Sequence, residues 1–291
     1  MGNGLSRRSV LAGAAALAGL SLTACAPQRP VHLDLGTPIA LAPLDVPELP
    51  TPSPTPPPVD VEAVIAAHEG RVPTVWGMDF PGIVRNGTEA GHEAPTSVFL
   101  TLDACGGPAG SGVDQVLIDG LRAAQIPATL FLNLRWIEAN PGVAAALAAD
   151  PLFSIQNHGS AHLPLSVTGA EAYGIFGTTS VPEAVDEIWA NHQTIASLTG
   201  TAPSWFRPGT AHLDDVGLSI AESLGERIAG FAINGDGGAT LPAADVAAAV
   251  SSAMGGEIII AHMNQPGSGT AEGILSAVDA MRASGVVFAT L

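Results

Sequence analysis

The sequence predicts one α/β domain built as a distorted (β/α)7 barrel. Short apolar runs recur from residue 97 onward, and amphipathic stretches with helical spacing separate them. Alternation of this kind produces a mostly parallel sheet whose crossover connections are right-handed. Most of the predicted strands also end in a polar residue. Because a barrel gathers the C-terminal ends of its strands at one mouth, this pattern favours closure over an open doubly wound sheet.

The predicted strands are short apolar runs bounded by turn-forming residues. In chain order they are 97–102, 128–132, 153–156, 205–207, 227–233, 258–261 and 286–289. Apolar content on both faces is typical of strands that are buried in a parallel sheet. These runs therefore predict the inner layer of the domain.

The predicted helices lie before and between these runs. In chain order they are 59–68, 113–125, 141–150, 181–199, 214–224, 243–254 and 270–284. The helix over 181–199 has a clear start, because Ser180 and Glu183 have the spacing of a capping box. The segment 70–96 has no periodicity and contains several Pro and Gly residues, so it is predicted to be loop-rich.

The N-terminal segment predicts export. Arg7 and Arg8 precede a run of Ala, Gly and Leu that is short for a membrane span, and the segment 1–25 resembles a twin-arginine signal. Residues 22–25 are similar to a bacterial lipobox, so we expect a lipid anchor on Cys25; a cleaved signal without lipid is the alternative. A proline-rich linker over 26–59 and a catalytic domain over 60–291 are expected to follow, in the cell envelope or secreted.

The charge and the cysteine content narrow the possible partners. The 291 residues carry a formal net charge of −17 and include no lysine, which argues against a nucleic-acid partner. Cys25 and Cys105 are the two cysteines, so an acylated Cys25 would leave Cys105 without a disulfide partner. We expect Cys105 to be a small buried residue rather than a reactive or metal-binding one.

The pair His158 and His162 is the sharpest local signal for chemistry. Two imidazoles four residues apart can bind one metal ion, whereas the alternative is two unrelated histidines. Asn157 and Ser160 lie beside the pair and could orient the rings. This segment is therefore a candidate metal site.

Four more polar residues follow predicted strands. Asp103 either faces a cleft or caps a turn. Arg207 follows two aromatic residues and is expected in a buried ion pair with Asp236. His262 follows a strongly apolar strand, where an imidazole suits proton transfer.

Two further histidines receive weaker predictions. His192 is expected on the solvent face of the helix over 181–199. His212 lies in the loop after Arg207 and could line a substrate cleft.

Taken in chain order, four motifs resemble those of the NodB-homology polysaccharide deacetylases, carbohydrate esterase family 4. They are Thr-Leu-Asp-Ala-Cys-Gly-Gly, His-Gly-Ser-Ala-His, Phe-Arg-Pro-Gly and Ile-Ala-His-Met-Asn. The resemblance covers about residues 95–291. It implies a NodB-like distorted barrel that removes N- or O-acetyl groups from extracellular polysaccharides with a divalent metal, often zinc.

The same resemblance implies catalytic roles for the residues after the strands. Asp103 matches the catalytic base and His262 matches the catalytic acid. Arg207 and Asp236 match the pair that holds the base in place.

The resemblance further implies that His158 and His162 bind the metal. Ala104 departs from the family pattern, because an aspartate ligand usually stands there, and the Asp-Ala-Cys sequence resembles a variant branch. With one of three usual ligands missing, Asp103 could move onto the metal, water could complete the site, or the metal could be lost.

The expected function is hydrolysis of acetyl groups from an extracellular or cell-envelope polysaccharide. One alternative is a glycan-binding pseudoenzyme that has lost its metal site, as Ala104 suggests. Another is a glycosidase that uses Asp103 and Asp236 as its carboxylate pair, although this leaves the histidine pair without a role.

Overall fold

The computed structural model describes residues 59–92, 96–108 and 110–291. The predicted export signal, the lipid site at Cys25 and all but the last residue of the predicted linker lie outside the described residues. Among the helices that the model describes, none combines the length and the apolar character that a membrane span requires.

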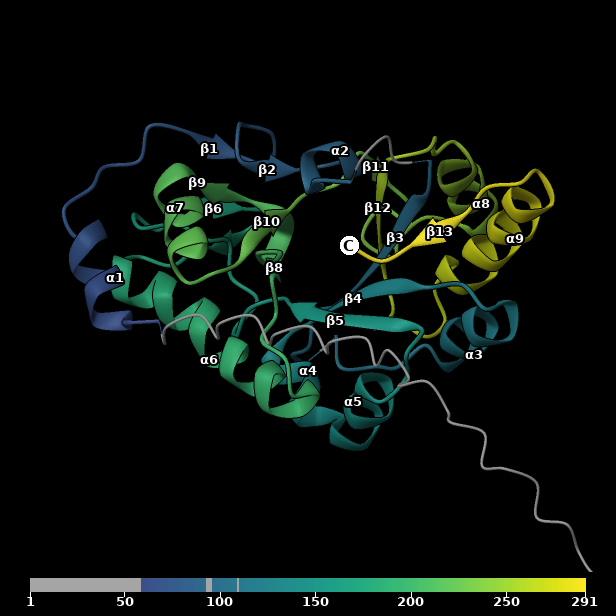
Figure 1. Cartoon of the computed structure of the whole chain (residues 1–291), viewed down its shortest axis with the longest axis horizontal. Helices are drawn as coiled ribbons and strands as arrows, with labels where there is room; N and C mark the ends of the chain where they lie inside the picture. Colours follow the sequence, from purple (N-terminus) through teal and green to yellow (C-terminus); the bar gives the residue numbers. More distant parts are fainter. Residues whose placement is uncertain (1–58, 93–95, 109) are drawn as a thin grey trace, which may run out of the picture. The chain divides into compact units, whose positions relative to one another are not determined.

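A parallel sheet forms the inner layer of the domain (Figure 1). Its order is β11-β12-β3-β4-β5-β8-β10-β2, and β13 also pairs with β3. The strands are β2 (Ile83–Val84), β3 (Val98–Ala104), β4 (Ala128–Leu132), β5 (Phe153–Asn157), β8 (Trp205–Phe206), β10 (Arg227–Ala229), β11 (Ile233–Asn234), β12 (Ile258–His262) and β13 (Phe288–Ala289). This confirms the predicted α/β class with a mostly parallel sheet.

Two parts of the sheet differ from the sequence prediction. The run 227–233 forms two strands, because β10 pairs with β8 and β2 whereas β11 pairs with β12. The segment 70–96, predicted to be loop, contributes β2 to the sheet as well as β1 (Trp76–Gly77) and α2 (Gly87–Ala90). Both differences arise from strands of two or three residues, which are too short to produce a recognisable period in the sequence.

Helices surround the outside of the curled sheet (Figure 1). They are α1 (Val61–His68), α3 (Gln115–Ala124), α4 (Leu134–Ala139), α5 (Pro141–Ala148), α6 (Val181–Thr199), α7 (Asp215–Ser223), α8 (Ala243–Ser251) and α9 (Thr270–Ala283). The Ser180 side chain caps α6 by accepting from the Glu183 N–H, as predicted. The short helix α4 was not predicted from the sequence; Asn133 caps it by accepting from the Arg135 N–H.

The sheet curls into a half-barrel. Side chains from six strands meet in one buried cluster on its inner side: Val84, Phe99, Phe131, Trp205, Ala229 and Ile258. The edge strands β11 and β2 are not paired with each other, so the described ladder stays open. A single backbone bond, from Ile258 N to Arg85 O at 3.2 Å, joins β12 to the residue that follows β2. The predicted barrel is therefore a distorted one.

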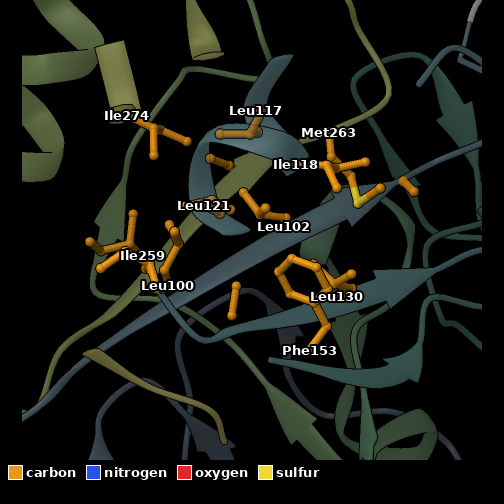
Figure 2. Packing of buried hydrophobic residues seen from close by; sticks show 14 of the residues in the cluster. Leu100, Leu102, Leu117, Ile118, Leu121, Leu130, Phe153, Ile259, Met263 and Ile274 are labelled. Atoms are coloured by element: carbon orange, nitrogen blue, oxygen red, sulfur yellow. The ribbon is translucent and has the colours of Figure 1, made fainter. Parts of the chain in front are cut away.

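Residues of β3 alternate strictly between the two sides of the sheet. Leu100 and Leu102 pack into the outer core against α3 and α9, as Figure 2 shows. Phe99 belongs to the inner cluster instead. Ala104 is fully buried and belongs to the outer core, whereas Asp103 faces the inner side. The strand thus turns every second residue to the inner side of the half-barrel, and Asp103 is the one of these that lines the cleft.

Candidate active site and metal centre

The functional residues gather where parallel strands end. His262 of β12 is the register partner of Asp103 in β3, and β5, which is separated from β3 by β4, ends directly before His158. A cleft of about 540 Å³ lies at these strand ends. Its lining includes Asp103, Cys105, His158, His162 and His262. The fold therefore unites residues that are far apart in the sequence.

Asp103 forms a buried ion pair with Arg207. An Nη1 hydrogen bond from Arg207 reaches Oδ1 of Asp103 at 2.7 Å, and both residues are buried. The guanidinium also donates to the Thr101 hydroxyl and to two backbone carbonyls, so it cannot turn away without losing several bonds. Burial raises the pKa of Asp103, but the charges of Arg207 and His158 outweigh it and hold this pKa below its ordinary value. The carboxylate is therefore ionised and fixed in place.

His262 has its own carboxylate partner. The predicted pairing of Arg207 with Asp236 is wrong, because Oδ1 of Asp236 lies 3.0 Å from Nδ1 of His262, and Oδ2 accepts the His262 backbone N–H at 2.7 Å. The Thr270 hydroxyl donates to the same carboxylate. Burial lowers the pKa of His262, but hydrogen bonding to Asp236 outweighs it and raises this pKa well above its ordinary value. The site therefore holds two carboxylates, each fixed by a different cation.

The ring of His158 is oriented by the backbone of the Arg207 segment. Nδ1 of His158 lies 2.7 Å from the Arg207 carbonyl oxygen, so Nδ1 carries the proton and donates. Nε2 then keeps its lone pair when the ring is neutral, and it lies 3.6 Å from Oδ2 of Asp103. A backbone bond at one nitrogen is the usual arrangement for a histidine that binds metal through the other.

The loop between His158 and His162 is held by Glu187 of α6. The Glu187 carboxylate accepts the backbone N–H of Ala161 at 2.8 Å and of Leu163 at 3.1 Å. His162 has φ 61°, a left-handed conformation that a non-glycine residue adopts only where its surroundings impose it. Burial raises the pKa of Glu187 to about 7, against the two N–H bonds that lower it. Glu187 was not identified from the sequence, because its role depends on contacts between distant segments.

At two glycines near the histidine loop there is no room for any side chain. A Cβ at Gly209 would overlap the His162 carbonyl, and one at Gly159 would overlap the Glu187 carboxylate. Asn157 and Ser160, predicted to orient the imidazoles, bond elsewhere: Asn157 donates to Ile188 O and Glu226, and the Ser160 hydroxyl donates to carbonyls of α6. The loop is therefore shaped by α6 and by the backbone after β8.

Cys105 occupies the centre of the site, which corrects the sequence prediction of a merely buried thiol. Its side chain is half-buried and lines the cleft, with Sγ 3.7 Å from Nε2 of His158. Burial raises the pKa of the thiol, but contacts with the imidazoles of His158, His162 and His262 outweigh it and hold this pKa well below its ordinary value. The sequence does contain a signal for this position of Cys105. It lies two residues after Asp103, and alternate residues of a strand share a face.

The residues at this point fit a metal ion. Within the described part of the chain, Cys105, His158 and His162 place their ligand atoms within 4.8 Å of one another. Thiolate and neutral imidazole are the ligands of many protein zinc sites, and Nε2 of His158 is free to bind. The three residues could therefore hold a metal ion.

The rim of the cleft includes residues that the sequence analysis did not single out. Tyr173 lies at the turn between β6 (Glu171–Ala172) and β7 (Ile175–Phe176), is strongly exposed and lines the cleft. His212 meets its ring edge-on, with centroids 5.2 Å apart, but does not itself line the cleft. Thr210, another lining residue, has φ 63° and a buried hydroxyl without a partner among the described residues.

His192 is buried, so its predicted place on the solvent face of α6 is wrong. Its Nδ1 lies 2.6 Å from Oε1 of Glu226, which is fully buried at the start of β10. Burial raises the pKa of Glu226 to about 7. This pair belongs to the packing of α6 against the sheet rather than to the cleft.

Comparison with known proteins identifies the domain. A family model described as polysaccharide deacetylase matches residues 90–229. A search of curated proteins found no match. Solved structures with a similar fold include a carbohydrate esterase family 4 pseudoenzyme from Bacillus anthracis, with a TM-score of 0.56 and 19% identity over 69% of this chain and 65% of that one. This chain thus spans less than two thirds of that pseudoenzyme.

Two further structures extend the comparison. A family 4 carbohydrate esterase from Streptomyces lividans, in complex with acetate, has a TM-score of 0.55 and 24% identity over 67% of this chain and 92% of that one. A peptidoglycan deacetylase from Bacillus subtilis has a TM-score of 0.54 and 19% identity over 68% of this chain and 89% of that one. Identities this low establish a common fold, and the family model adds the sequence relationship. Residues 90–229 therefore match the polysaccharide deacetylase family, and the domain has the fold of the carbohydrate esterase family 4 structures.

Proposed function

We propose that this domain hydrolyses acetyl groups, N- or O-linked, from an extracellular or cell-envelope polysaccharide. The observation that carries the proposal is the pairing of opposite proton-transfer groups in one cleft. Asp103 is kept ionised by Arg207, and His262 is kept protonated by Asp236. A base and an acid with separate partners are what hydrolysis of an amide or ester requires.

The family implies a divalent metal, and we propose that it is zinc and that His158 and His162 hold it. When bound, such an ion polarises a carbonyl and lowers the pKa of water. The Arg207 carbonyl keeps the proton of His158 on Nδ1 and leaves Nε2 for the ion. Glu187 keeps the loop that carries His162 in its left-handed conformation.

The remaining steps are performed by side chains of this domain. Oδ2 of Asp103 accepts a proton from the attacking water, while Oδ1 stays bonded to Arg207. Nε2 of His262 donates a proton to the departing nitrogen or oxygen, while Nδ1 stays bonded to Asp236. Each residue therefore transfers a proton with one atom and is positioned by the other.

The direct test is acetate release from chitooligosaccharide, peptidoglycan and acetylated xylan, with and without a chelator. We expect Asp103→Asn to lower activity by about 10²–10⁴-fold, because the amide cannot accept the proton of the attacking water. Asp119→Asn, which changes an exposed carboxylate, is the matched control and should keep wild-type activity. Full activity in Asp103→Asn would contradict the assigned base.

A pseudoenzyme that binds glycans is the second candidate. Ala104 favours it, because the usual aspartate ligand is missing, and one similar structure is described as a family 4 pseudoenzyme. Metal content, glycan binding and acetate release, measured on the same chain, distinguish the deacetylase from the pseudoenzyme. Glycan binding by a chain that contains no metal and releases no acetate from any of the three substrates would select the pseudoenzyme.

We also propose that the chain is exported through a twin-arginine signal and anchored by lipid at Cys25. Arg7 and Arg8 followed by a short apolar run support export, and the similarity of residues 22–25 to a lipobox supports the anchor. A proline-rich linker after the anchor would hold the domain away from the membrane.

A further inference from the structure

We propose that Cys105, as a thiolate, is the third protein ligand of the metal held by His158 and His162, in place of the carboxylate that is absent at Ala104. The proposal uses the metal centre of the proposed function, but it concerns metal binding and does not depend on acetate release.

The first support comes from the direction of the side chains in β3. Ala104 is fully buried in the outer core, in the same apolar cluster as Leu102, Leu132 and Trp136. A carboxylate at position 104 of this backbone would therefore enter the core instead of the cleft. Cys105 is the next residue on the side of Asp103, and it lines the cleft. The donor has thus moved by one residue along the chain.

The second support is the spacing of the three donors. Zinc–sulfur and zinc–nitrogen bonds of about 2.3 and 2.0–2.1 Å place sulfur and nitrogen roughly 3.6 Å apart around a tetrahedral ion. Sγ of Cys105 lies 3.7 Å from Nε2 of His158, and the three ligand atoms lie within 4.8 Å of one another. The Cys105–His158 distance thus already matches the spacing of a tetrahedral site.

The third support is that Asp103 and Asp236 are each held by a cationic partner of their own. Oδ1 of Asp103 accepts from Arg207 at 2.7 Å, and this guanidinium is anchored at three further acceptors. Asp236 accepts the backbone N–H and the Nδ1–H of His262, and also the hydroxyl of Thr270. Asp103 therefore remains available as a base while Cys105 completes the ligand set.

A thiolate ligand makes a specific prediction about metal preference. Soft thiolate donors favour zinc and cobalt, whereas carboxylate and water ligands suit magnesium and manganese. We therefore expect the wild-type chain to prefer Zn²⁺ strongly over Mn²⁺ and Mg²⁺. Cys105→Asp should keep a metal site with a weaker preference for Zn²⁺, because it presents a carboxylate on the same side of β3.

The experiment is cobalt loading of the full chain, followed by near-ultraviolet absorption and by zinc competition with a chromophoric chelator. We expect a thiolate-to-cobalt charge-transfer band in the wild type and none in Cys105→Ser or Cys105→Asp. Zinc affinity should fall in Cys105→Ser by more than the ~10–100-fold that losing a ligand's hydrogen-bonding partner costs. Ala104→Asp should lower the thermal midpoint without raising zinc affinity.

A measurement on the unmodified chain covers the case in which a variant does not fold. Zn²⁺ should slow alkylation of Cys105, as followed by peptide mass spectrometry, and leave alkylation of an unacylated Cys25 unchanged. Equal alkylation of Cys105 with and without Zn²⁺, or an unchanged zinc affinity in Cys105→Ser, would overturn the proposal.

The results also distinguish this inference from the proposed function. A cobalt–thiolate band together with no acetate release would support the ligand and remove the deacetylase. Chelator-sensitive acetate release with no cobalt–thiolate band would support the deacetylase and overturn Cys105 as a ligand. Acetylation of Cys105 during turnover, with chelator-resistant activity, would make the thiol a nucleophile and would also overturn the proposal.

Discussion

The ion pair of Arg207 and Asp103 differs from a surface ion pair in its exposure to solvent. Its N–O distance is 2.7 Å, close to the 2.6 Å between Arg85 and Asp79, yet Arg207 and Asp103 are buried, whereas Arg85 is half-buried and Asp79 is exposed. Water screens the exposed pair, so it contributes about 0–1 kcal/mol. Removing one partner of a buried pair instead leaves a charge without compensation.

Arg207→Met should therefore lower the free energy of unfolding by about 3–5 kcal/mol, because Asp103 would remain buried and unpaired. Urea denaturation at neutral pH measures this change. Arg85→Met is the matched control, with an expected loss of about 0–1 kcal/mol. The double variant Asp103→Asn with Arg207→Met should recover part of the loss, since it removes the stranded charge. Equal losses in the two single variants would contradict this account.

At the scale of elements, α6 connects the metal-binding loop to the sheet. Glu187 holds the loop between His158 and His162, and Asn191 donates to Leu132 O and to the Asn157 side chain. The next residue of α6, His192, bonds to Glu226 directly before β10. Buried polar groups that bond to one another in this way fix the register of a helix against a sheet.

Glu226 gives the stability of this contact a defined dependence on pH. Its pKa is about 7 in the folded domain against an ordinary value of 4.5, because burial disfavours the charge. Between these values the folded chain keeps the proton and the unfolded chain releases it, so the free energy of unfolding falls as pH rises from about 4.5 to about 7. Above about 7 this contribution no longer changes.

Glu226→Gln should flatten this part of the pH profile, because the amide does not ionise. The measurement is the thermal midpoint as a function of pH, from about pH 5 to about pH 8. This range includes most of the interval in which Glu226 ionises. The same change at Glu138, an exposed residue of α4, should leave the wild-type slope intact. Parallel profiles for wild type and Glu226→Gln would show that Glu226 is ionised throughout.

At the scale of the whole molecule, the curled sheet brings distant segments to one cleft. Asp103 and His262 are register partners, although most of the domain's sequence lies between them. Aromatic and aliphatic side chains from six strands fill the inner side and hold this curvature. The cleft is therefore a consequence of sheet curvature and of parallel strand direction.

The proposed anchor is a second property of the whole chain. We expect the wild type to incorporate fatty acid and to sediment with membranes, and Cys25→Ala to be released, because the thiol is the attachment point. Cell fractionation with lipid labelling measures both. Replacing Arg7 and Arg8 by lysine is the control for the export route and should retain the chain in the cytoplasm. Membrane association of Cys25→Ala would contradict the lipid anchor.

The sequence by itself determines the α/β class, most strands, and which residues stand at strand ends. Period-two and period-3.6 patterns are local, so β4 and α6 are found within a residue or two of their bounds. The motif order also resembles that of the polysaccharide deacetylases, whose family model matches residues 90–229. It does not determine which carboxylate pairs with which cation, because Arg207 could reach Asp103 or Asp236 depending on how the sheet curls.

Only the tertiary structure decided three features of the site. It paired Arg207 with Asp103 and His262 with Asp236, and it turned Ala104 into the core. It also placed Cys105 among the imidazoles, where a lone thiol in the sequence carried no such meaning. The physical reason is common to all three: each depends on which side of a curved sheet a side chain faces and on what distant strand lies opposite, and neither is a local property of the chain.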